Sequence, residues 1–182
     1  MRTRLAYAAI LCALATAIML PPLSSPRFGL LDDGVTIALS PHLIRSLREG
    51  RLASLLTLET ERGRLKPLSF LYYAVQYAAW DASPGGFFAV QWLSLLLTSL
   101  LIAGIGELTT AKQLAGFLAG GAYLLSGPVM ENYYTLSKGE PPLVLWLALS
   151  VFFLAFAIRA LGSGGRLVTC TFAASLPPLA LA

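Results

Sequence analysis

Long apolar runs, separated by short polar breaks, constrain this chain more than any other feature. The sequence holds five of them, at residues 5–23, 85–106, 113–130, 141–158 and 167–182. A helix needs about 20 predominantly apolar residues to cross the hydrocarbon core of a bilayer. Only 12% of the residues are charged, against about a quarter in soluble domains. The pattern predicts an all-α, polytopic transmembrane helical bundle that forms a single domain, residues 1–182.

The first and last runs each allow a second interpretation. Residues 5–23 follow two arginines, a start that is typical of a membrane anchor and of a secretory signal peptide alike. A proline pair then follows without a small-residue cleavage site, which favours the anchor and leaves the signal peptide as the alternative. Residues 167–182 contain another proline pair, which predicts a kinked or shortened helix.

The basic residues of the short loops predict the orientation of the chain. Lysine and arginine in short loops mark the cytoplasmic side of a membrane protein. Because successive spans alternate in direction, one side receives Arg2, Arg4, Lys112, Arg159 and Arg166. We therefore expect a cytoplasmic N-terminus in the inner (plasma) membrane, with residues 24–84 and 129–140 on the external face.

The long external loop contains signals for two amphipathic interfacial helices. Ser40 as N-cap, Pro41 at the first helical position and Gly50 as a stop predict the first. Pro67 opens the second, which extends to Trp80 and is only about 21 Å long, too short to cross a bilayer. Packing on the membrane surface explains both helices. A platform beside a lipid-linked substrate is the functional alternative.

The third apolar run contains small residues at helical spacing. Gly116 and Gly120 stand four residues apart, and such glycines let two helices approach closely within a membrane. The spacing predicts ordinary packing inside the bundle, with a dimer interface as the alternative.

Two charged clusters border the expected external face. Asp32 and Asp33 follow the first span, where their position favours a site and a plain turn is the alternative. Glu131, Lys138 and Glu140 lie between the third and fourth spans. A helix start carries free N–H groups and a partial positive charge, which attract anions. This second cluster therefore predicts a phosphate site, and a helix-capping role for Glu140 is the alternative.

The order of these motifs resembles the GT-C superfamily of integral-membrane glycosyltransferases. "LLDDG" is similar to the acidic motif of that family's first external loop, and "GRLKPLSFLYYAVQYAAW" is similar to the segment that opens its second external helix. "ENYYTLSKGEPPLVLWLALS" resembles its acidic external loop before a span. The resemblance covers nearly all of residues 1–160. Lys66 departs from it, because the family has an arginine there, and residues 87–97 lack a polar pattern of several members.

The resemblance implies transfer of a sugar from a polyprenyl-phosphate carrier to an acceptor hydroxyl at the external face. It implies that Asp32, paired with Asp33, is the catalytic general base. Cations would offset the charge of the departing lipid phosphate. The implied substrate-binding residues are Arg64, Lys66, Lys138, Glu140 and Glu131. The implied partners are the lipid-linked sugar donor and membrane lipids. No cofactor is implied, although a divalent metal remains an open alternative.

Other functional classes are the alternatives to a complete glycosyltransferase. Family members have seven or more spans, so five predict an N-terminal portion, or one part of a split enzyme whose partner chain supplies further helices. A non-catalytic assembly subunit is the main alternative. A transporter subunit needs charges inside the spans, and these runs carry none. His42 is the single histidine, which excludes a multi-histidine metal site, and no basic face interleaved with aromatics suggests nucleic acid.

Overall fold

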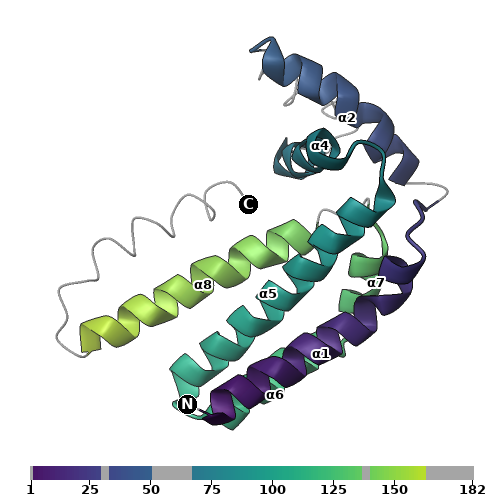
Figure 1. Ribbon diagram of the computed structural model, residues 1–182. Coiled ribbons are helices and arrows are strands. Elements are labelled where there is room, and N and C mark those ends of the chain that lie inside the picture. Colours follow the sequence, from purple (N-terminus) through teal and green to yellow (C-terminus); the bar gives the residue numbers. More distant parts are fainter. Residues whose placement is uncertain (1, 30–32, 51–66, 137–139, 163–182) are drawn as a thin grey trace.

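The computed structural model describes residues 2–29, 33–50, 67–136 and 140–162, which form helices and no strand (Figure 1). The helices are α1 (Arg2–Ser24), α2 (Asp33–Arg48), α4 (Pro67–Trp80), α5 (Pro84–Thr110), α6 (Gln113–Leu124), α7 (Gly127–Tyr134) and α8 (Glu140–Gly162). The expected all-α fold class is confirmed.

Three of these helices, α1, α5 and α8, are long and apolar enough to cross a membrane. At 1.5 Å per residue they extend roughly 34, 40 and 34 Å, more than the hydrocarbon thickness of about 30 Å. They confirm the helices expected over 5–23, 85–106 and 141–158, and they indicate a membrane protein. The run at 167–182 lies outside the described residues.

The continuous helix expected over 113–130 is wrong. The chain forms α6 and then α7, with a break at Leu125 and Ser126 between them. Pro128 explains the break, because it has no N–H and its ring would clash with the carbonyl of Leu124 in an unbroken helix. Proline suits the first turn of a new helix, which is where α7 has it. α6 extends only about 18 Å and does not by itself cross a bilayer.

Polar contacts and ring contacts establish the direction of the helices. At one end of the bundle, Arg4 of α1 forms an ion pair with Glu107 of α5, and Arg159 of α8 donates to the carbonyl of Leu108 at 3.1 Å. At the other end, Phe28 lies edge-to-face against Phe87, with centroids 5.7 Å apart. α5 and α8 therefore run in the same direction, and α1 runs opposite to both (Figure 1).

Close packing joins α6 to α5 through the two spaced glycines. A Cβ atom on Gly116 would lie 2.3 Å from the carbonyl oxygen of Ala103, and one on Gly120 would lie 2.8 Å from that of Ser99. Both distances are far below contact distance, so only glycine fits at these positions. The packing predicted for Gly116 and Gly120 is therefore present within this chain, between α5 and α6.

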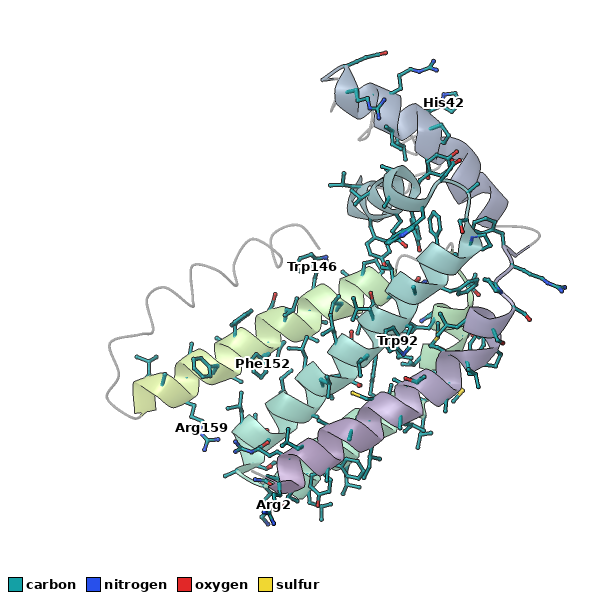
Figure 2. The ribbon with its side chains drawn as sticks, in the orientation of Figure 1. Arg2, His42, Trp92, Trp146, Phe152 and Arg159 are labelled. Carbon is teal, nitrogen blue, oxygen red and sulfur yellow. The ribbon has the colours of Figure 1, made fainter. Side chains whose placement is uncertain are left out.

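A hydrophobic core lies where α1, α4, α5, α6 and α7 meet. Its most buried side chains are Leu11, Ala15, Met19, Tyr73, Phe87, Phe88, Leu95, Leu124, Tyr133 and Leu136. α8 packs on the other flank of α5, where its Phe152 ring covers Gly104. Most of the remaining surface of α8 is exposed, including Trp146, which suits a helix in contact with lipid (Figure 2).

The two helices expected in the long loop are present, one of them with a different start. α4 spans Pro67–Trp80, as expected, and Gly50 adopts the left-handed φ of 70° that ends a helix. The start expected at Ser40 and Pro41 is wrong, because α2 begins at Asp33 and contains Pro41 in its interior. Ser40 is completely buried, so tertiary packing outweighs the local signal for a helix start.

Candidate functional site

The structure gathers several helix ends on the side of the bundle that also carries α2 and α4, here called the α2/α4 end. The end of α1, the start of α5, α7 and the start of α8 lie there (Figure 1). The hydroxyl of Tyr134 in α7 donates to the carbonyl of Ile18 in α1, which holds α7 against this part of α1. α2, α4 and α7 thus lie at one end of the bundle (Figure 1).

Three of the acidic or basic residues predicted as a site belong to helices at this end. Asp33 is the first residue of α2 and Glu140 is the first residue of α8. Glu131 lies in α7, and the side chains of Glu131 and Glu140 are exposed. Pro141 is buried directly after Glu140, so the start of α8 sits at the boundary between packed interior and surface.

Four predicted site residues are not among those that the structure describes. Asp32, Arg64, Lys66 and Lys138 lie outside the described residues. The general base and the phosphate-binding cations therefore remain predictions from the sequence.

A cluster of buried polar side chains lies beneath the α2/α4 end. The Tyr72 hydroxyl of α4 and the Ser94 hydroxyl of α5 are 3.4 Å apart. The hydroxyls of Tyr123 in α6 and Tyr133 in α7 are 3.2 Å apart, and Thr98 of α5 lies beside both phenols. Four helices thus contribute polar groups to one interior region.

Gln91 stands out within this region. Its side chain is 1% exposed, and neither its amide nitrogen nor its amide oxygen has a hydrogen-bond partner among the residues that the structure describes. A buried polar group without a partner costs about 1–3 kcal/mol. The side-chain amide of Gln91 therefore either lowers the stability of the fold or binds a ligand, a water molecule or another chain.

Burial favours the neutral form of two tyrosines in this cluster. Burial raises the pKa of Tyr72, and it likewise raises the pKa of Tyr133. Both phenols are therefore neutral at physiological pH, where they offer hydroxyl groups for hydrogen bonds and do not act as bases.

The spacing of polar residues along α5 is a signal for this cluster that we did not use when predicting the site from the sequence. Gln91, Ser94 and Thr98 follow one another at intervals of three and four residues, which places them on one face of a helix. Polar residues on one stripe of an otherwise apolar span indicate a face turned toward other helices and away from lipid.

Metal ligands do not gather in the described part of the chain. Within residues 2–29, 33–50, 67–136 and 140–162, no three His, Cys, Asp or Glu side chains form a group suited to a metal ion.

Comparison with known proteins adds no relative. A scan against protein-family models, a search of curated proteins and a search of solved structures each found no match to this chain.

Proposed function

We propose that this chain belongs to a membrane glycosyltransferase that moves a sugar from a polyprenyl-phosphate carrier to an acceptor hydroxyl. One observation carries the proposal. α2 and α8 begin with Asp33 and Glu140 at the α2/α4 end of a membrane-spanning bundle, where α7 also presents Glu131. Carboxylates at the mouth of such a bundle are suited to activating a hydroxyl beside a lipid-linked donor.

The proposed reaction needs a base and a group that stabilises the leaving phosphate. The carboxylate of Asp32 takes the proton of the acceptor hydroxyl, whose oxygen forms a bond to the anomeric carbon of the sugar. The bond between that carbon and the phosphate oxygen breaks, and the polyprenyl phosphate leaves with the electron pair. The cations proposed to stabilise this anion are Lys138, Arg64 and Lys66, and Glu140 and Glu131 orient the acceptor.

The opposite end of the bundle supports the proposed orientation. Arg2, Arg4, Lys112 and Arg159 lie there, at the ends of α1, α5 and α8 and the start of α6 (Figure 2). Positive charge in short loops favours the cytoplasmic side. The proposal therefore has the N-terminus in the cytoplasm and the α2/α4 end outside, in the inner (plasma) membrane.

A transfer assay in reconstituted vesicles tests the proposal. The donor is a polyprenyl-phosphate sugar, and the variants are Asp32→Asn, Asp33→Asn and the double replacement. Loss of a general base typically lowers the rate by about 10²–10⁴, and we expect this loss for Asp32→Asn. Glu107→Gln is the matched control, because it removes a carboxylate at the opposite end of the bundle. Near wild-type rates in the double variant overturn the proposal.

A further inference from the structure

A cavity of about 600 Å³ lies between α2 and the end of α4. α2 contributes Ile44, Arg45 and Arg48 to its wall, and α4 with the residue after it contributes Tyr77, Trp80 and Asp81. Of the predicted catalytic or substrate-binding residues that the structure describes, namely Asp33, Glu131 and Glu140, none lines it. The cavity therefore needs its own explanation.

The described residues of the cavity wall carry more positive than negative charge. Arg45 and Arg48 are three residues apart and so lie on one face of α2. Neither guanidinium has an ion-pair or hydrogen-bond partner among the residues that the structure describes. Asp81 is the carboxylate among the described residues of the wall, and its interaction with the Tyr77 hydroxyl raises the pKa of Tyr77. Among the described residues, two cations thus line the cavity against one carboxylate.

The cavity lies next to the start of a membrane-spanning helix. Trp80 and Asp81 stand three or four residues before Pro84, where the spanning helix α5 begins. The wall combines apolar Ile44 and the aromatic rings of Tyr77 and Trp80 with two guanidinium groups. Tyrosine and tryptophan favour the depth of lipid headgroups. Arginine recognises phosphate through two parallel hydrogen bonds.

From the cavity, its two unpartnered arginines and its place beside the start of α5, we infer that it binds a phosphate group at the membrane surface. This inference does not depend on the proposed transfer reaction. The source of the phosphate is either the headgroup of an anionic lipid or free phosphate, and the two share the same contacts with Arg45 and Arg48.

The test uses Trp80 as the reporter in the full chain in detergent. Trp80 fluorescence, defined as the signal lost in Trp80→Phe, is titrated with short-chain phosphatidic acid, with inorganic phosphate and with zwitterionic short-chain phosphatidylcholine. We expect a saturable change with phosphatidic acid, roughly tenfold weaker for each arginine removed in Arg45→Gln and Arg48→Gln. Arg27→Gln is the matched control, because Arg27 is exposed near the same end and does not line the cavity.

Comparing the titrants distinguishes the two possible sources of the phosphate. Saturation with phosphatidic acid and not with inorganic phosphate assigns the site to a lipid headgroup, whereas equal affinity for both assigns it to free phosphate. The double variant Arg45→Lys with Arg48→Lys retains the charges, and we expect it to keep part of the affinity, which separates lost binding from lost folding. Equal affinity for phosphatidic acid in wild type and in Arg45→Gln with Arg48→Gln overturns the inference.

Discussion

The Nη2 atom of Arg4 lies 2.5 Å from the Oε1 atom of Glu107, so the start of α1 is tied to the end of α5. The pair joins two helices that cross the bundle in opposite directions. Its side chains are 63% and 25% exposed, and ion pairs in water are worth only about 0–1 kcal/mol. The pair therefore shows how the two helices are aligned and adds little to the free energy of unfolding.

A double-mutant cycle checks this view of Arg4 and Glu107. We expect Arg4→Ala, Glu107→Ala and the double variant to give a coupling energy below about 1 kcal/mol. The measurement is reversible unfolding of the full chain in detergent. High salt should reduce the coupling further, because exposed charges are screened. A coupling of several kcal/mol would show that the pair is buried by lipid or by a partner.

The glycines of α6 provide a test of the α5–α6 interface. We expect Gly116→Ala to destabilise the bundle by about 1–3 kcal/mol, because the new Cβ would press on the Ala103 carbonyl oxygen and overpacking of this kind is costly. Gly121→Ala is the matched control, since a Cβ there meets nothing within 4 Å. The midpoint of thermal unfolding in detergent compares the two. Equal midpoints would contradict the observed packing.

The unpartnered amide of Gln91 leads to a third prediction. Gln91→Leu keeps a similar volume and removes the unsatisfied polar atoms, so the free energy of unfolding should rise by about 1 kcal/mol. Gln113→Leu makes the same change at the partly exposed start of α6 and should have little effect. If Gln91→Leu instead lowers stability, the amide has a partner in the membrane-embedded protein.

Cysteine labelling tests the proposed orientation. In a background with Cys12→Ala and Cys170→Ala, a membrane-impermeant maleimide added to intact cells should label Ser83→Cys, before α5, and Thr135→Cys, after α7. Ala111→Cys, in the turn between α5 and α6, should be labelled only after the membrane is opened. Labelling of Ser83→Cys without Thr135→Cys would break the shared-face argument, and labelling of Ala111→Cys alone would reverse the orientation.

Lys138 is the predicted cation nearest to the start of α8. If it contacts the donor phosphate, Lys138→Ala should weaken binding of a polyprenyl-phosphate sugar in nanodiscs, and Lys138→Arg should preserve part of it. Lys112→Ala, at the opposite end of the bundle, is the control. An unchanged donor affinity in Lys138→Ala removes this residue from the site.

Some features that depend on neighbouring residues were predictable from the sequence, although the helix start expected at Ser40 and Pro41 was not. The three spanning helices follow from uninterrupted apolar length, and α4 begins at its proline and ends at Trp80 as expected. The common end of α2, α4 and α7 follows from the alternation of spans. The helix break before Pro128 also has a local cause, but the apolar composition of residues 113–130 led us to predict one continuous helix.

The sequence by itself determined the three long apolar helices α1, α5 and α8, because an uninterrupted apolar length acts within each segment. Tertiary structure alone decided which polar groups meet. Gln91 and Thr98 share a face of α5 in any helix, but only packing against α4, α6 and α7 buries that face. The cavity of Arg45 and Arg48 likewise exists because α2 packs beside α4, and contacts between segments far apart in the chain leave no local pattern.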